Sequence, residues 1–157
     1  MSTEHSADAK ETISRFGKLL VELAEKKVDF AVVGGMAVIF NGYERLTLDV
    51  DILVHDSPEN LRQLLDCLSH WGKGWARELK IEDFAPGEGC VRVMDEFDLD
   101  IFTRMRGKSL SDFRSGLRYL ETLGVGLAPR AYHNPFFCYA GGAYPTSLIY
   151  FLASPCH

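Results

Sequence analysis

Two carboxylates stand two positions apart inside an apolar segment, because Asp49 and Asp51 fall within the run Leu48–Val54. The β-branched neighbours favour a strand, in which alternate side chains point to the same face. The two Cα atoms would then lie roughly 6.6 Å apart, and anions at that separation repel by about 2–3 kcal/mol at an effective dielectric constant near 20. Mg²⁺ binds one or two carboxylates together with water and phosphate oxygens. The pair therefore indicates metal-assisted phosphoryl chemistry, although a solvated sheet edge or a salt-bridged surface pair would show the same pattern.

A glycine pair upstream supplies a second feature of such a site. The apolar run 29–33 favours a short strand that stops at Gly34 and Gly35, and Met36–Phe40 continues as a predicted helix. This order lets the backbone approach a phosphate group, with free N–H groups and the positive end of the helix dipole facing it. An ordinary strand-to-helix turn uses the same residues, but the acidic segment fifteen residues after Gly34 favours phosphate binding.

Together these residues carry a family resemblance. Gly34-Gly35, thirteen intervening residues and Asp49-x-Asp51 resemble the nucleotidyltransferase superfamily related to DNA polymerase beta. The resemblance implies an α+β fold with a mixed β-sheet and helices packed against it, nucleotidyltransferase-like in arrangement. Most members of the superfamily carry Gly-Ser at the glycine pair, so Gly35 removes one hydroxyl contact to phosphate.

The superfamily places a third carboxylate on a later, adjacent strand, and this chain has two candidates. Residues 90–94 and 97–102 favour two strands joined by a turn, which predicts a hairpin. Asp98 and Asp100 would share one face of the second strand. The family form is an acid directly before two or three apolar residues, so Asp100 is assigned the third role and Asp98 is the reserve candidate.

The longer pattern Arg45-x-Thr47-x-Asp49-x-Asp51 is similar to the group that contains the nucleotidyltransferase toxins of abortive-infection systems and their uncharacterised relatives. The resemblance implies two Mg²⁺ or Mn²⁺ ions, one bound by Asp49, Asp51 and the NTP, the other by both of these and Asp100. Such ions, about 3.5–4 Å apart, stabilise the attacking and leaving oxygens of an in-line displacement. Asp100 would also orient or deprotonate the attacking hydroxyl. Nucleotide contacts are expected from Gly34, Gly35, Arg45 and Thr47, although an ordinary surface position is an equal alternative for Arg45.

Composition is typical of a compact globular domain. The chain has 157 residues, 46% hydrophobic and 25% charged, which is close to the average for folded domains. The polar residues 1–10 do not resemble a secretory signal, and the longest apolar run, 31–40, is too short to span a bilayer. The four cysteines lack Cys-x-x-Cys spacing, which favours a reduced, cytoplasmic protein without zinc and without a membrane.

The net charge of −5 bears on partners. Binding a polynucleotide normally requires a basic stripe, and the sequence has no such run. We therefore expect a metal-dependent transfer of NMP from an NTP to a hydroxyl of an acceptor. That acceptor is a partner protein, a small molecule or, less favoured by charge, RNA, and a toxin–antitoxin component is one setting. The alternative is a degenerate, non-catalytic module that binds a nucleotide or a partner.

The spacing of apolar residues, together with capping residues, prolines and glycines, predicts the remaining elements. A helix over 9–27 has an apolar stripe, and a second helix begins at Ser57-Pro58 and ends before Gly72. The other predictions are short strands at 75–79 and 81–85, and a helix that starts at Ser109 or Ser111 and runs to about Leu123.

The last thirty residues differ from the rest. After Pro129, Arg130 is the one charged side chain, and aromatic residues are dense. The resemblance covers roughly residues 10–127, so we predict a nucleotidyltransferase-like domain over 1–127 and an atypical apolar, Pro- and aromatic-rich tail over 128–157. Three explanations stay open for the tail: an irregular docking arm, an interface for a homodimer or a partner protein, or a frame change in the gene.

Overall fold

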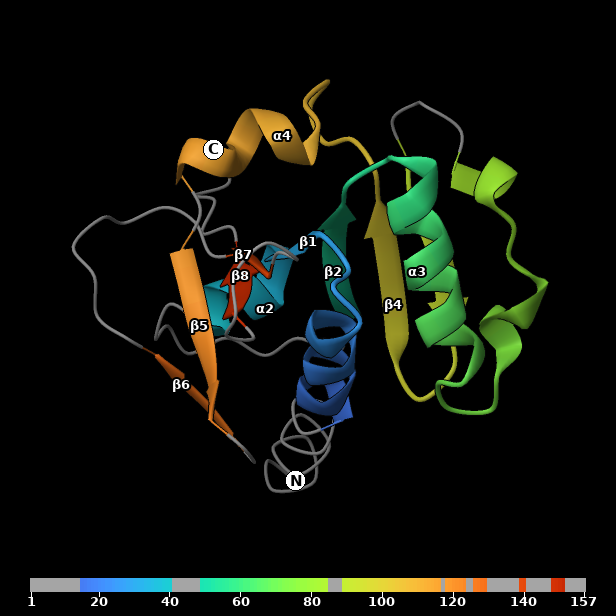
Figure 1. Ribbon diagram of the computed structural model, residues 1–157, viewed down its shortest axis with the longest axis horizontal. Coiled ribbons are helices and arrows are strands. Elements are labelled where there is room, and N and C mark those ends of the chain that lie inside the picture. Colours follow the sequence, from blue (N-terminus) through green and yellow to red (C-terminus); the bar gives the residue numbers. More distant parts are fainter. Residues whose placement is uncertain are drawn as a thin grey trace, which may run out of the picture.

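The computed structural model describes residues 15–40, 49–84, 89–116, 118–123, 126–129, 139–140 and 148–151. It has the predicted α+β class, with helices on a mixed sheet (Figure 1). Residues 15–25 are helical. The later elements are β1 Phe30–Val33, α2 Gly34–Phe40, β2 Asp49–Val54, α3 Pro58–Ser69, β3 Val91–Met94, β4 Asp98–Phe102, α4 Leu110–Phe113, β5 Arg118–Leu123, β6 Gly126–Pro129, β7 Tyr139–Ala140 and β8 Leu148–Phe151, with 3₁₀ turns at Trp75–Glu78, Ile81–Phe84 and Arg114–Gly116.

The sheet has the strand order β3-β4-β2-β1-β8-β5-β6, and β7 also pairs with β1. β2 runs parallel to β4, whereas β1 is antiparallel to β2 and β3 is antiparallel to β4. The predicted hairpin of β3 and β4 is confirmed. Because β2 and β4 are adjacent and parallel, their acidic residues come together at the same level of the sheet.

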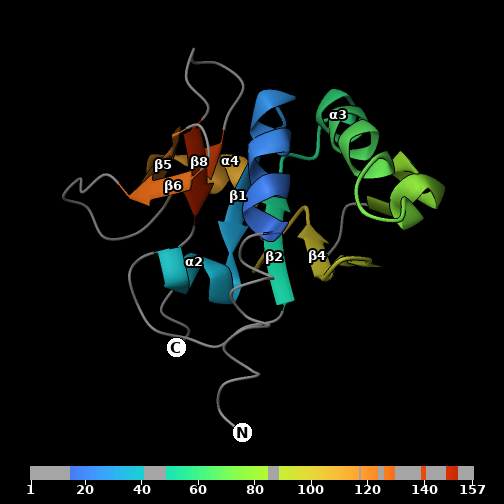
Figure 2. The same cartoon turned by 90° about the horizontal axis from the view of Figure 1, so that it is seen from below.

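The core lies between this sheet and the helices on one of its faces. Figure 2 shows helix 15–25 and α3 on the same side of the sheet. Phe16, Leu20 and Leu23 are fully buried, which confirms the apolar stripe for the described part of that helix. The Phe16 ring meets Phe97 edge-on, with ring centroids 5.8 Å apart. The sheet position that carries the acidic residues is therefore supported by a continuous apolar layer.

The predicted start of α3 is confirmed. The Ser57 hydroxyl accepts a hydrogen bond from the Asn60 backbone N–H at 3.3 Å, and Pro58 occupies the first turn. Leu64 and Leu68 are fully buried. The helix ends at Ser69, and Gly72, with φ of 54°, lies in the turn that follows. Local capping chemistry thus sets this helix, which packs beside β4.

Two predictions of secondary structure are wrong. The segments 75–79 and 81–85 were predicted as strands, but Trp75–Glu78 and Ile81–Phe84 form 3₁₀ turns. The Asp95 carboxylate accepts the backbone N–H groups of Lys73 and Trp75 at the first turn, and the Asp83 carboxylate accepts that of Lys80 at the second. The helix predicted to reach Leu123 ends at Phe113. Residues 118–123 instead form β5, because they pair with β6 and β8, and two ladders of hydrogen bonds outweigh a weak local helix preference.

Parts of the predicted tail extend the sheet beyond β1. β7 pairs with β1 at Phe30 and Ala31, and β8 pairs with it in parallel at Val32. β8 also pairs with β5. Other tail residues lie outside the described ranges, and the boundary at 127 stays a prediction. In the part of the chain that the structure describes, no helix is long and apolar enough to cross a membrane.

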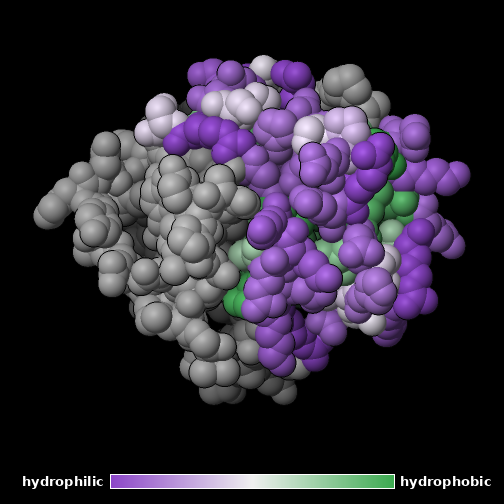
Figure 3. Space-filling model, in the orientation of Figure 1, coloured by the Kyte–Doolittle hydropathy of each residue, from purple (hydrophilic) through white to green (hydrophobic). Residues whose placement is uncertain are grey.

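The visible surface of the described residues is mostly hydrophilic (Figure 3). Trp75 and Met94 are large hydrophobic side chains that are more than half exposed. The Lys73 ammonium group lies 5.5 Å from the centroid of the Trp75 ring, a cation–π distance.

Candidate functional site

The register of β2 and β4 builds an acidic ladder, by which we mean Asp49, Asp51, Asp98 and Asp100. Asp49 pairs with Asp98, and Asp51 pairs with Asp100. Partner residues on adjacent strands point to the same face, so the predicted same-face geometry of both Asp-x-Asp pairs is confirmed. The residue between each pair, Val50 or Leu99, is fully buried. One face of these strands therefore carries carboxylates while the alternate side chains anchor the strands in the core.

Burial increases across the acidic ladder. Asp49 is exposed, Asp51 and Asp98 are half-buried, and Asp100 is only 6% exposed. A carboxylate as buried as Asp100 requires a compensating partner, because an isolated charge in such a position is costly. The identity of that partner decides what the site can bind.

Arg92 on β3 is the partner of Asp100. The two residues are opposite each other in the hairpin, and Arg92 Nε and Nη2 lie 2.7 Å from Asp100 Oδ1 and Oδ2. These hydrogen bonds hold the pKa of the Asp100 carboxyl below its usual range, against the opposing effect of burial. They also raise the pKa of Arg92, and the charges of Asp49 and Asp98 add to that rise.

Arg92 was not predicted as a site residue. In the predicted hairpin, alternation puts Arg92 on one face of its strand, between Val91 and Val93. The predicted two-residue turn of Asp95 and Glu96 would put Arg92 opposite Leu99. The observed register pairs Arg92 with Asp100 and leaves one more residue in the turn, so the predicted register could not locate the pair.

Gly34 lets the chain at the end of β1 lie against the acidic ladder. It has φ of 67°, and its neighbour Val33 pairs with Asp51. A Cβ atom on Gly34 would lie 2.2 Å from Asp51 Oδ2, a distance that no side chain can occupy. The predicted order of strand, glycine pair and helix is confirmed. Gly34 is required at its position because Asp51 lies so close to it.

Cys90 adds a thiol beside the same carboxylate. It is exposed, and its interaction with Asp100 helps to lower the pKa of that carboxyl. Partial burial, followed by the charge of Asp100, raises the pKa of the Cys90 thiol. Arg45 and Thr47, the other predicted nucleotide contacts, lie outside the described residues.

The donors of the acidic ladder are of the type that a hard divalent cation takes. Asp49 and Asp51 offer carboxylate oxygens on one face, and Asp100 lies next to Asp51, which are the ligands that Mg²⁺ and Mn²⁺ prefer. Both oxygens of Asp100 are bonded to Arg92. Within the described ranges, no three or more His, Cys, Asp or Glu side chains are grouped closely enough to hold a metal ion.

No protein-family model, curated protein or solved structure matches this chain. Function is therefore inferred from the chemistry of the side chains.

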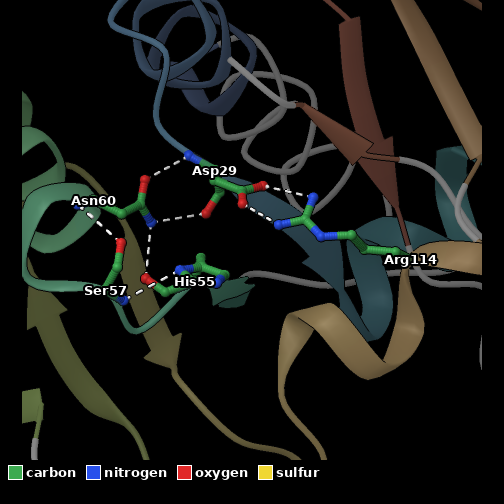
Figure 4. Close-up of polar contacts among 5 residues, drawn as sticks. All are labelled: Asp29, His55, Ser57, Asn60 and Arg114. Carbon is green, nitrogen blue, oxygen red and sulfur yellow. Dashed lines mark hydrogen bonds and ion pairs between the residues drawn. The ribbon is translucent and has the colours of Figure 1, made fainter. Parts of the chain in front are cut away.

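A second polar cluster, the Asn60 cluster, joins several elements at the start of β1 and the end of β2 (Figure 4). Asn60 Oδ1 accepts the Asp29 backbone N–H at 2.7 Å, and its Nδ2 donates to the backbone carbonyls of Asp29 at 3.0 Å and His55 at 2.8 Å. His55 Nδ1 accepts the Ser57 N–H at 3.2 Å, and Arg114 forms an ion pair with the Asp29 carboxylate. These contacts bind protein groups to one another, which marks the cluster as structural.

Burial raises the pKa of the Asp29 carboxyl, and Arg114 opposes that rise. The sequence contains no local signal for this cluster, because Asp29 and Asn60 are 31 residues apart.

Proposed function

We propose that this protein is a metal-dependent nucleotidyltransferase that moves NMP from an NTP to a hydroxyl group of an acceptor. The observation that carries the proposal is the parallel register that puts Asp51 beside Asp100 and Asp49 beside Asp98. Four carboxylates on adjacent strands repel one another, and a divalent cation beside them would relieve that repulsion.

Asp49 and Asp51 would hold one Mg²⁺ or Mn²⁺ ion with the triphosphate, and these two residues together with Asp100 would hold a second ion. The ions would supply positive charge that stabilises the negative charge developing on the transferred phosphate and on the leaving pyrophosphate. Asp100 would orient the acceptor hydroxyl and accept its proton as the oxygen bonds to the α-phosphorus. The bond from the α-phosphorus to the bridging oxygen breaks, and pyrophosphate leaves with that electron pair.

The arrangement around Gly34 supports the resemblance to the nucleotidyltransferase superfamily. The chain runs through β1, the glycine pair, α2 and the acidic strand β2, and then returns to the sheet as the hairpin of β3 and β4. This order is the one that the resemblance implies, and it puts Gly34 against Asp51. The acceptor is proposed to be a protein, a small molecule or RNA in the cytoplasm, and a toxin–antitoxin component is one setting.

A second candidate is a non-catalytic module that binds nucleotide or a partner. The bidentate pairing of Asp100 with Arg92 favours it, because a carboxylate held by arginine is not available to a hydroxyl group. Gly35 in place of the serine of most superfamily members points the same way.

Label transfer separates the two candidates. The full chain is incubated with each α-³²P-labelled NTP and Mg²⁺ or Mn²⁺, together with RNA, with cell extract, or alone. We expect covalent label that depends on the metal and is lost in Asp49→Asn/Asp51→Asn. The matched control is Asp56→Asn, an exposed carboxylate just after β2. Nucleotide binding without label in any acceptor would support the non-catalytic module.

Thermal unfolding provides the binding arm of the same experiment. A ligand at one hundred times its Kd stabilises the folded state by about 2.7 kcal/mol. We expect a rise in Tm that requires both metal and NTP, is absent in the double variant, and is retained in Asp56→Asn. If no NTP shifts Tm in the presence of metal, both candidates that bind nucleotide are wrong.

A further inference from the structure

We infer that Arg92 is an internal counter-cation that competes with a divalent metal ion for Asp100. The inference rests on the proposed function, because it uses the metal site that the proposal assigns to the acidic ladder. It adds a control on that site: metal binding at Asp100 requires the guanidinium group to leave.

The charges of the ladder motivate the competition. Four carboxylates lie on one face of β2 and β4, and the Arg92 guanidinium lies across the most buried of them. The charges of Asp49 and Asp98 also act on this group. In the site without metal, Arg92 thus neutralises part of the negative charge. A divalent ion would neutralise more of it.

The geometry makes the two cations antagonistic. Arg92 Nε and Nη2 are each 2.7 Å from one Asp100 oxygen, a fork that uses the favoured direction of both oxygens. A metal ion at either oxygen would stand close to the guanidinium group, and two cations at such short range repel. Occupancy by one therefore weakens binding of the other.

The burial of the pair determines which partner moves. The side chain of Arg92 is 50% exposed, whereas that of Asp100 is 8% exposed. β3 is at the end of the strand order, so the guanidinium group can turn to solvent without opening the core. Asp100 is held in β4 between two paired strands. Arg92 is therefore the residue of the pair that moves. It neutralises the charge of Asp100 until a metal ion binds there.

The test measures Mn²⁺ binding to the full chain without nucleotide, from the electron paramagnetic resonance signal of free Mn²⁺. Arg92→Met keeps a long side chain and removes the charge. We expect its Kd for Mn²⁺ to be lower than that of the wild type by at least about tenfold, which corresponds to about 1.4 kcal/mol. Arg92→Lys, which keeps a charge and loses the fork, should show a smaller decrease.

Two control variants locate the effect. Arg104→Met removes a guanidinium group that pairs with Asp56 at 3.8 Å, and it should leave the Kd for Mn²⁺ unchanged. Adding Asp100→Asn to Arg92→Met should abolish the gain in affinity. A purely structural ion pair would lower stability in Arg92→Met and leave Mn²⁺ affinity where it was.

Each outcome decides the inference. Tighter Mn²⁺ binding in Arg92→Met, or unfolded Arg92→Met that folds when Mn²⁺ is added, supports it. Equal or weaker binding, including no binding in any variant, overturns it. If Arg92→Met stays unfolded with Mn²⁺, Arg92→Lys decides in the same way. A gain in Mn²⁺ affinity in Arg92→Met without label transfer by the wild type would support the competition and refute the transferase. Label transfer without that gain would support the transferase and refute the competition.

Discussion

Two of the Asp–Arg pairs among the described residues differ in what surrounds them. Arg114 and Asp29 belong to the Asn60 cluster, where backbone and side-chain groups from several elements hydrogen-bond one another. Arg92 and Asp100 belong to the acidic ladder, where carboxylates gather on adjacent strands. The first pair completes a network that holds β1, β2 and α3 together. The second partly neutralises an excess of negative charge, which is where we propose the metal site.

The pKa values separate the two pairs as well. The arginine hydrogen bonds dominate at Asp100 and lower its pKa. Burial dominates at Asp29 and raises its pKa. The pKa values of the two aspartates therefore shift in opposite directions, because burial and the charge of the arginine contribute differently at the two positions.

Among the polar residues and the glycines, the largest effect on stability is expected at the Asn60 cluster. Asn60→Ala removes a buried side chain that makes three long-range or turn-closing hydrogen bonds. It should lower the free energy of unfolding by about 3 kcal/mol, because buried backbone groups lose their partners. Urea unfolding measures this loss, and Gln63→Ala on the same helix is the control, with an expected change within about 0.5 kcal/mol. Equal losses in the two variants would show that Asn60 is not a structural centre.

The next effect tests the junction between β1 and the acidic ladder. Gly34→Ala puts a Cβ atom in the space of Asp51 Oδ2, in a backbone region that costs a non-glycine residue about 1–2 kcal/mol. We expect that loss in urea unfolding and, in addition, weaker Mn²⁺ binding. Gly107→Ala is the matched control, because Gly107 has φ of 72° but a Cβ atom there would meet no other atom within 4 Å. If Mn²⁺ affinity falls equally in both variants, the contact between Gly34 and Asp51 does not control metal binding.

The pH dependence of stability should have opposite signs at the two aspartates. The pKa of Asp100 is below its ordinary value of 3.8, so its stabilising contribution is present above that value and is lost as pH falls through the lowered pKa. The pKa of Asp29 is above 3.8, so the folded state gains stability as pH falls through the raised pKa towards 3.8. Urea unfolding between neutral pH and about pH 3, compared among the wild type, Asp29→Asn and Asp100→Asn, measures both contributions. The same sign of change in the two variants would contradict the comparison.

The smallest effect on stability is expected at Asp51. Asp51→Asn relieves repulsion within the acidic ladder, so the free energy of unfolding without metal should stay within about 1 kcal/mol of the wild type or rise slightly. Stabilisation by metal and NTP should nevertheless be abolished. Leu64→Ala gives the scale, since a truncated core leucine should cost about 2–5 kcal/mol. A loss of several kcal/mol in Asp51→Asn would place Asp51 with the structural residues of the Asn60 cluster.

Much of the acidic ladder could be predicted because it depends on local alternation. Apolar residues between the carboxylates placed Asp49 with Asp51, and Asp98 with Asp100, on one face of each strand. Arg92 was missed because its role depends on hairpin register. The predicted turn of Asp95 and Glu96 puts Arg92 opposite Leu99, whereas the observed turn contains one more residue. The Asn60 cluster could not be predicted, since its central hydrogen bonds join residues 31 positions apart.

The sequence by itself determined the features that short-range physics controls. These are the alternation of β2 and β4, the Ser57 cap and Pro58 of α3, and the glycine pair at the end of β1. Only the tertiary structure decided the parallel pairing of Asp51 with Asp100, the bidentate hydrogen bonding of Arg92 to Asp100, and the formation of strand β5 by residues 118–123. The physical reason is range: capping and periodicity act over a few residues, whereas register and strand pairing depend on partners that are distant in the chain.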